Sequence, residues 1–361
     1  MTDAPNTARI RITNCHIHTF TAKHTPFFFP AWYLIPFKLM PLLVEIAAKL
    51  IRGWFPGQAE WLLRLIKFRR FSALSTQAKI FEAVRIQYPS DTRFVVLPMD
   101  MELMRHGWVT EDLDTQHSKL FELADQHPGR IIPFCTVHPD RDDAAQRVER
   151  YLDQGARGLK IYPRLGYRPD HPVLMQRIYP MIAERGLPVM THCSRGGVAQ
   201  RGLGQRLGDE YSAPQAVIPV MQAFPDLRIC LAHFGGQDDW LEFVKGRIDP
   251  LADDAARRNW MIAIRQMIES GDWENLYTDI SYTLFFFDEL APFLKVFLTG
   301  EGDRKDRLRN RVLFGSDHYM SRNTAYAERE VSVRLRLTLG EDLFRQIAET
   351  NPDHWLGSPG A

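Results

Sequence analysis

Short apolar runs alternate with helix-like stretches along most of this chain. From residue 93 onward, the apolar runs are bounded by polar, Gly or Pro residues, and one earlier run covers residues 9–12. The later runs are residues 94–98, 130–137, 158–162, 188–193, 228–233, 276–280 and 312–315. Runs of this length and composition predict buried β-strands.

Stretches with helical periodicity lie between these runs. We expect helices at residues 115–127, 144–154, 173–185, 213–224, 240–247 and 260–269, and a last one at 341–349 that ends before Asn351-Pro352. A repeated strand and helix order indicates a parallel sheet, and eight strands favour a closed (β/α)8 TIM barrel of the α/β class. The chain of 361 residues therefore fits a single domain, residues 1–361.

Residues 19–93, between the first and second strands, form too long a connection for an ordinary βα unit. We interpret them as an inserted helical cap, rich in aromatic residues, with helices expected at 41–52 and 58–71. Pro30, Pro36 and Pro41 interrupt its most apolar part, residues 26–51, so no transmembrane segment is predicted. The cap either roofs the active site, forms the face of a homodimer or packs on the barrel flank, and the sequence leaves these open.

Charge and cysteine usage exclude some classes of protein. The net charge of +1 offers no global field for a polyanion, so no nucleic-acid partner is expected. The four cysteines are scattered rather than paired, which indicates buried thiols in a reducing compartment. Residues 1–9 are polar and contain no apolar signal core, so we expect a cytoplasmic protein.

Residues with metal-binding and acid-base chemistry fall at the ends of the predicted strands. His16 and His18 are two residues apart and so project from one face of the first strand. Later strands carry Lys160, His192, His233 and Asp317. Each of these alone has a structural explanation, such as a core histidine or a helix cap. Because catalytic groups gather at the carboxyl ends of barrel strands, we expect these six side chains to converge at that end of the barrel, which we call its mouth.

With this ordered set, the chain resembles the amidohydrolase superfamily, in particular its amidohydrolase-2 branch of metal-dependent hydrolases and decarboxylases. The resemblance implies that His16, His18 and Asp317 hold a first divalent ion, most simply Zn²⁺, with Mn²⁺ or Fe²⁺ as alternatives. It also implies that Lys160 is carbamylated by CO₂ and bridges to a second ion held by His192 and His233. Two ions are bound in that case, and one ion if Lys160 is unmodified.

The activity implied is hydrolysis of an amide, ester or lactone bond in a small organic substrate by metal-activated water. Asp317 would take the proton of the water and pass it to the leaving group. The alternative is a non-oxidative decarboxylase of an aromatic or unsaturated carboxylic acid, in which one metal is bound and His233 handles protons. A non-catalytic binding protein is a further alternative, which predicts no turnover.

Other residues beside the predicted mouth are candidates for secondary roles. Tyr162 would hydrogen bond to an oxyanion, or else pack in the barrel. A guanidinium group suits a substrate carboxylate, and three arginines follow predicted strands: Arg164, Arg195 and Arg322. Asp100 and Asp279, at the ends of two further strands, are expected to orient the ligand histidines.

Overall fold

Short parallel strands form the centre of the protein, which we describe from a computed structural model. The structure describes residues 9–29, 41–55, 59, 62–63, 66, 73–281, 287–321 and 328–357. The strands are β1 (Thr13–Ile17), β2 (Arg93–Val96), β3 (Ile131–Pro133), β4 (Cys135–Thr136), β5 (Leu159–Ile161), β6 (Val189–Thr191), β7 (Ile229–Leu231), β8 (Leu276–Asp279) and β9 (Val312–Leu313). All pairs between neighbours are parallel, in the orders β1-β2-β3 and β4 to β9.

Two backbone contacts join these sheets into one closed ring. Phe134, between β3 and β4, donates its N–H to the carbonyl of Val96 at 3.0 Å. Cys15 of β1 donates to the carbonyl of Phe314, just after β9, at 2.8 Å. The predicted (β/α)8 barrel is therefore confirmed.

The strand predictions differ from the structure in two places. The run 130–137 is divided into β3 and β4, because Pro133 has no N–H to continue the ladder. The first strand begins at Thr13, later than the apolar run 9–12, so the histidine pair starts within the strand. His16 lies at an irregularity in the β1–β2 pairing, where its N–H donates to Asn14 Oδ1 and its carbonyl accepts from the Asp317 N–H.

The barrel interior is filled by side chains from strands that are distant in sequence. Cys15, Val95, Met190, Cys230 and Leu313 belong to five different strands and are all buried in one apolar cluster. Residues from five strands meet only inside the ring, as expected for a packed barrel core.

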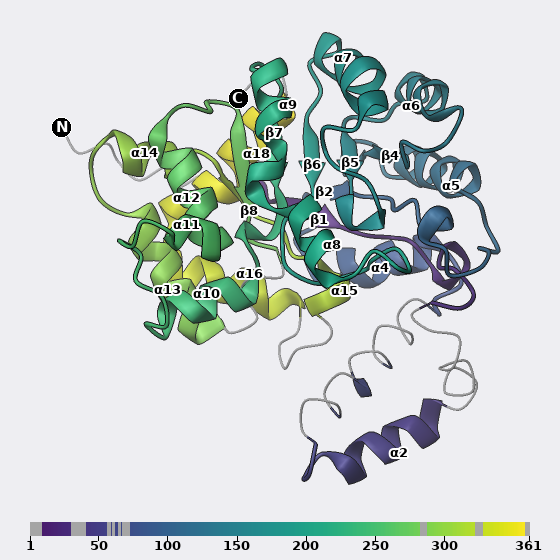
Figure 1. Cartoon of the computed structure of the whole chain (residues 1–361), viewed down its shortest axis with the longest axis horizontal. Coiled ribbons are helices and arrows are strands. Elements are labelled where there is room, and N and C mark those ends of the chain that lie inside the picture. The colour runs from purple at the N-terminus through teal and green to yellow at the C-terminus, as the bar shows by residue number, and fades with distance from the viewer. Residues whose placement is uncertain are drawn as a thin grey trace.

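Helices surround the strands on the outside (Figure 1). They are α4 (Gln77–Arg85), α5 (Leu113–Gln126), α6 (Ala144–Asp153), α7 (Tyr179–Glu184), α8 (Gln205–Ser212), α9 (Ile218–Ala223), α10 (Gln237–Val244), α11 (Ala255–Arg258), α12 (Trp260–Ser270), α13 (Phe287–Leu298), α14 (Asp303–Arg309), α15 (His318–Ser321), α16 (Glu328–Leu339), α17 (Glu341–Arg345) and α18 (Asn351–Leu356). Short helical turns are η1 (Ala22–His24), η3 (Glu102–Met104), η4 (Pro163–Leu165), η5 (Leu174–Ile178), η6 (Pro214–Val217), η7 (Ala232–Phe234) and η9 (Gln346–Thr350).

Buried apolar stripes position the helices on the barrel, and side-chain caps begin some of them. In α6, Val148, Tyr151 and Leu152 are buried at helical spacing, so one face packs on the barrel. Asp112 begins α5 by accepting a hydrogen bond from the Thr115 N–H, and Asn259 does the same for Ile262 at α12.

The prediction that the last helix ends before Asn351-Pro352 is wrong. Helical residues continue through η9 into α18. Pro352, which has no N–H to donate, directly follows the π-helical turn η9, where the Asn351 N–H bonds to the Gln346 carbonyl and the α-helical ladder is already interrupted. The Asn351 amide donates to the carbonyls of Arg309 and Val312, both at 2.7 Å, which anchors the start of α18.

The described part of the insertion after β1 includes α2 (Pro41–Ile51), as expected for the range 41–52. Figure 1 shows α2 set apart from the barrel. Most of the second expected helix, 58–71, lies outside the described residues. Among the helices that the structure describes, none is long and apolar enough to cross a bilayer.

Candidate metal centre

Four imidazole rings from three strands lie in a row at the carboxyl end of the barrel. Neighbouring ring centroids are 5.1 Å apart for His18 and His16, 4.9 Å for His16 and His233, and 4.9 Å for His233 and His192. All four are buried. The structure therefore brings together the histidines that the sequence singles out.

Hydrogen bonds fix the orientation of the first two rings. His16 Nδ1 lies 2.8 Å from Asp279 Oδ2, and His18 Nδ1 lies 2.7 Å from the carbonyl oxygen of Leu97. Because a carboxylate and a carbonyl only accept, both Nδ1 atoms carry the proton. Both Nε2 atoms are then acceptors, and they face each other at 3.3 Å.

Two facing lone pairs repel unless a cation lies between them, so this arrangement tests whether a metal fits. Two nitrogens that each lie about 2.05 Å from a tetrahedral Zn²⁺ are about 3.3 Å apart. The observed separation of the Nε2 atoms of His16 and His18 has this value. The pair therefore fits a divalent ion.

Asp317 completes this ligand set from the other end of the chain. Its N–H donates to the carbonyl of His16 at 2.8 Å, and its φ of 45° turns the backbone sharply after Gly315-Ser316. Asp317 Oδ1 lies 3.9 Å from His18 Nε2. The ligand atoms of His16, His18 and Asp317 all lie within 4.8 Å of one another.

A buried polar network holds the strand of His16 against the turn of Asp317. The Asn14 amide donates to Ser316 Oγ at 2.9 Å, and its Oδ1 accepts from the Ser316 N–H at 3.1 Å. The same oxygen accepts from the His16 N–H at 3.2 Å. One side chain thus sets the relative position of two elements that carry ligands.

His233 and His192 form a second pair beside the first. His233 Nδ1 faces the Ser281 carbonyl at 3.2 Å and its Nε2 lies 3.1 Å from His192 Nδ1. A hydrogen bond from His192 Nδ1 to His233 Nε2 satisfies both rings. His233 has a φ of 72°, in the left-handed region, within the turn η7. Its ligand atoms also cluster with those of His16 and Asp279.

Lys160 projects from β5 into the same buried space. Burial lowers the pKa of Lys160 to about 8, although the negative charges of Asp279 and Asp317 oppose this shift. A lysine with a lowered pKa has more of the neutral amine that reacts with CO₂. The environment is therefore compatible with the carbamate that the resemblance implies.

Burial also keeps the histidines neutral, which is the form that binds a metal. Burial, reinforced by the positive charge of Lys160, lowers the pKa of His18 to about 3, and it lowers the pKa values of His16 and His233 well below 6.5. Burial raises the pKa of Asp317 to about 7. A carboxyl group in this range is suited to taking and returning a proton at neutral pH.

The candidate substrate-binding residues differ in what they contact. The Tyr162 ring stacks on the His192 ring with centroids 4.2 Å apart. Arg164 is buried and forms an ion pair with Asp209. Arg195 is 3.2 Å from Asp239 and packs on the Trp260 ring. Arg322 lies outside the described residues.

The two aspartates that we expected to orient ligand histidines behave differently. Asp279 does so, through His16 Nδ1 and through the backbone N–H of His233, which it accepts at 3.0 Å. The prediction for Asp100 is wrong, because its carboxylate binds the guanidinium group of Arg141 with both oxygens at 2.7 Å.

Sequence reasoning did not find Ser281 or Asn14 at the site. Ser281 Oγ lies 3.1 Å from His16 Nδ1 and 3.0 Å from His233 Nδ1. Ser281 lies two residues after Asp279 and Asn14 two before His16, so the two-residue period of a strand was an available signal for both.

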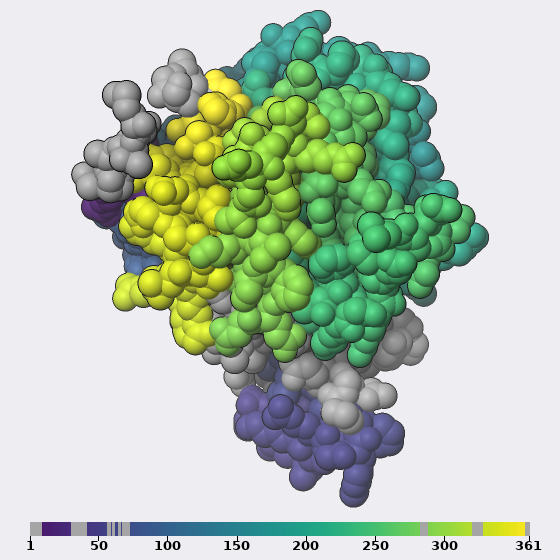
Figure 2. Space-filling view, turned by 90° about the vertical axis from the view of Figure 1, so that its left-hand side faces the viewer, coloured from purple at the N-terminus to yellow at the C-terminus, as the bar shows by residue number. Residues whose placement is uncertain are grey.

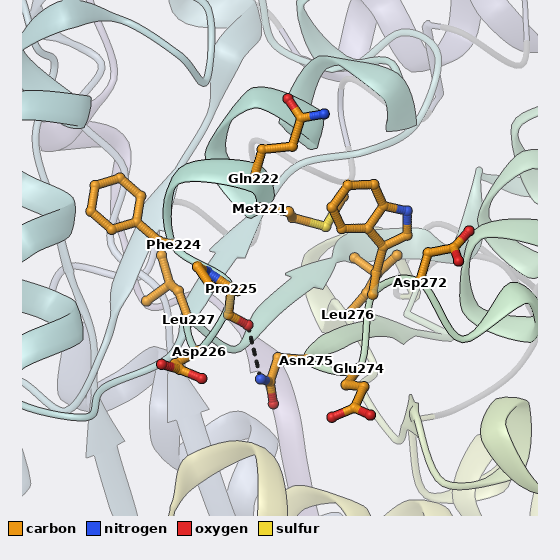
Figure 3. Close-up of a pocket in the computed structure, with 11 residues that line it drawn as sticks. Met221, Gln222, Phe224, Pro225, Asp226, Leu227, Asp272, Glu274, Asn275 and Leu276 are labelled. Atoms are coloured by element: carbon orange, nitrogen blue, oxygen red, sulfur yellow. Dashed lines mark hydrogen bonds between the residues drawn. The ribbon is translucent and has the colours of Figure 1, made fainter.

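A cavity of about 390 Å³ lies at the opposite end of the barrel, where β7 and β8 begin (Figure 3). Leu227 and Leu276 line it beside the acidic residues Asp226 and Glu274, and the Asn275 amide donates to the Pro225 carbonyl at 3.0 Å. The amino ends of barrel strands serve stability rather than chemistry, so we do not assign the active site there.

Comparison with known proteins defines the class. The sequence model of the Amidohydrolase family, Amidohydro_2, matches residues 87–357, and this chain belongs to that family. The match begins after β1, so His16 and His18 join the site on the geometry described above. No curated protein sequence matches the chain.

Solved structures with the same fold share little sequence with the chain. An uncharacterised TIM-barrel protein from Bordetella bronchiseptica is 16% identical, with a TM-score of 0.54 over 96% of this chain and 98% of that one. A probable 2-pyrone-4,6-dicarboxylic acid hydrolase from Acinetobacter baumannii, with citric acid bound, is 10% identical, with a TM-score of 0.54 over 96% and 100%. A 5-carboxyvanillate decarboxylase from Novosphingobium aromaticivorans, in complex with manganese and a nitrobenzoic acid, is 13% identical, with a TM-score of 0.53 over 96% of each chain.

Proposed function

We propose that this protein is a metal-dependent hydrolase that cleaves an amide, ester or lactone bond in a small organic substrate. The observation that carries the proposal is the set of His16, His18 and Asp317, whose ligand atoms lie within 4.8 Å with both Nε2 atoms free of protons. Three protein ligands leave coordination positions for water and substrate. Zn²⁺ suits two imidazoles and one carboxylate, and Mn²⁺ or Fe²⁺ are the alternatives.

The bound ion would lower the pKa of a coordinated water to about 7 and polarise the scissile carbonyl. Asp317 accepts the proton of the attacking water and returns it to the leaving group. Asp279 holds His16 in the tautomer that presents Nε2. Tyr162, Arg164, Arg195 and Arg322 are proposed to bind the substrate, with Arg164 and Arg195 first leaving their carboxylate partners.

In the two-metal form of this proposal, Lys160 carries a carbamate and holds the second ion with His192 and His233. The carbamate replaces a positive charge by a negative one, which removes the repulsion between an ammonium group and two cations. The lowered pKa of Lys160 supports its modification.

A decarboxylase is the second candidate, and the hydrogen-bonded pair of His192 and His233 favours it. His233 Nε2 already has a partner at 3.1 Å, so the described histidines do not need a second ion between these rings. In this reading His192 joins the single ion, His233 delivers the proton that replaces CO₂ on carbon, and unmodified Lys160 binds a substrate carboxylate.

Metal content and native mass distinguish the two. Protein purified without chelators is analysed for metals and weighed under native conditions, which preserve a carbamate. About two ions per chain and one added CO₂ support the binuclear hydrolase. One ion and unmodified Lys160, with CO₂ release from aromatic or unsaturated acids, support the decarboxylase. Full activity in a folded His16→Asn variant would contradict both.

We also propose residues 19–93 as a cap region and the cytoplasm as the compartment. The four cysteines are free and buried, which fits a reducing environment. A non-catalytic binding protein remains the least favoured reading, since it gives no reason for the buried ligand set.

A further inference from the structure

The outer face of α2 is apolar and exposed to solvent. Leu43, Ile46 and Leu50 lie at helical spacing on one side, with 53%, 48% and 74% of their surface exposed. The turn that follows continues this stripe with Trp54, which is 82% exposed, and Phe55, which is 54% exposed. We call these five residues the α2 face.

The opposite side of α2 is apolar as well. Val44 and Ala48 are buried, so this side already has its packing partners. Glu45 and Lys49 form the polar edge of α2, and a helix with one polar edge normally buries the remainder of its surface. The α2 face therefore lacks the cover that its composition demands, and contiguous exposed apolar surface of this kind marks an interaction site.

Charge along the stretch of sequence that contains α2 differs from that of the rest of the chain. Residues 26–71 contain seven Lys and Arg and two Glu, a net charge of +5, whereas the whole chain carries +1. The remainder of the chain therefore carries −4. Arg52 is exposed between α2 and Trp54, and Lys49 lies beside Leu50 with its own partner, Glu45, at 3.2 Å. The apolar face thus lies within a basic segment attached to a slightly acidic body.

We propose that the α2 face docks on the surface of an anionic phospholipid bilayer. Leu43, Ile46, Leu50 and the two aromatic rings would enter the interfacial layer, and basic side chains such as Arg52 would contact the lipid phosphates. Apolar and aromatic residues next to Lys and Arg are the composition of helices that lie in a membrane interface. This proposal does not depend on the reaction assigned above.

Length and position agree with a peripheral contact. The 11 residues of α2 extend about 16 Å, roughly half the apolar thickness of a bilayer, so the helix lies on the surface and does not span it. Figures 1 and 2 both show α2 at one end of the molecule, away from the barrel. The α2 face can therefore contact a membrane that the barrel does not touch.

A second copy of the chain is a poorer occupant of the same face. In a two-fold dimer the α2 face would meet itself and bring two segments of +5 together. The face is also small, since a helix about 16 Å long and 10 Å wide offers far less than the roughly 800 Å² per partner of a stable interface. An anionic surface instead matches the basic charge.

The test uses full-length protein and vesicles in a flotation assay. One set of vesicles is phosphatidylcholine alone, and the other contains roughly 30% phosphatidylglycerol, an anionic lipid. The test variant is Ile46→Gln with Leu50→Gln. The matched control is Val333→Gln with Leu337→Gln on α16, where the side chains are 51% and 79% exposed. Far-UV circular dichroism and metal content check that each variant is folded.

We expect the wild-type protein to float with anionic vesicles and much less with neutral ones. The affinity of the α2 variant for anionic vesicles should be about tenfold lower, because two apolar side chains no longer enter the interface. Arg52→Glu should weaken binding to anionic vesicles only, and salt above about 0.1 M should do the same. The α16 control should bind like the wild type.

Three results would overturn the proposal. The first is absence of binding to either vesicle, and the second is binding that the α2 variant retains in full. The third is a dimer, seen by sedimentation velocity, that the α2 variant converts to monomers, because the α2 face would then be an interface between copies of the chain.

Discussion

Replacing Asp279 by asparagine tests how the site prepares His16 for metal binding. In the wild type, Asp279 Oδ2 accepts the Nδ1 proton of His16 at 2.8 Å, while Oδ1 accepts the backbone N–H groups of His233 and Ser281 at 3.0 and 2.9 Å. An asparagine with its oxygen at the Oδ1 position keeps the two backbone bonds. Its NH₂ group then faces His16 Nδ1, where only an acceptor can bind it.

The variant should therefore bind metal more weakly without losing its fold. A hydrogen bond to a charged group contributes about 1.5–3 kcal/mol, and His16 must also move its proton to Nε2, the atom that faces the ion. This range corresponds to a loss of about 10- to 150-fold in metal affinity. It agrees with the effect of removing similar partners of ligand histidines in other metal sites.

Competition with a chromophoric chelator measures the metal affinity of the purified protein. Asp238→Asn is the matched control, because Asp238 is an exposed acid at the start of α10 that makes no contact with the ligand histidines among the described residues. Equal metal affinities of Asp279→Asn and wild type would refute the reasoning. A loss of the same size in Asp238→Asn would assign the effect to overall charge.

Three further predictions concern ligand chemistry, packing and pH. Asp317→Asn should lower turnover by more than about 100-fold while far-UV circular dichroism stays unchanged, and a fully active variant would remove Asp317 from the site. Gly315→Ala should cost about 1–3 kcal/mol in urea unfolding, because the new Cβ would lie 2.8 Å from His16 Cβ; unchanged stability would show that the strand can shift. Burial lowers the pKa of His117 to about 4, so the unfolded chain binds its proton first as pH falls from about 6.5 to 4. The contribution of His117 to stability should fall by about 2 kcal/mol between pH 7 and 5, so His117→Gln should lose about 2 kcal/mol less than the wild type over this range; equal losses would contradict the reasoning.

The barrel was predictable because strand periodicity and helix capping are local signals. The division of the third strand was also marked locally, by Pro133, although an apolar run hides it. The continuation of the last helix was not marked in this way. The hydrogen bonds of Asn351 to α14 and β9 hold the residues before Pro352 in place. These partners are 42 and 39 residues away in sequence, so no local pattern predicts them.

The convergence of His16, His18 and Asp317 was predictable from residue type and strand ends, but the roles of Asp100 and Asp279 were not. Asp279 is the last residue of β8, whereas Asp100 lies beyond the end of β2 and binds the guanidinium group of Arg141. The left-handed backbone conformation of His233 could not be predicted from the sequence either, because the turn that follows it packs against α12, which is distant in sequence. Contacts between residues distant in sequence therefore determine these side-chain roles and this backbone conformation, which local sequence patterns do not predict.

The hydrogen bonds between Asn14 and Ser316 join residues 302 positions apart in the chain. A ribosome must therefore synthesise nearly the whole barrel before His16 and His18 can meet Asp317. Any shorter nascent chain exposes a histidine pair without its carboxylate, and such a pair binds an ion weakly and without geometric selection. At the proposed metal site, selection of the ion would thus be a property of the closed barrel, possible only after the first and last strands have met.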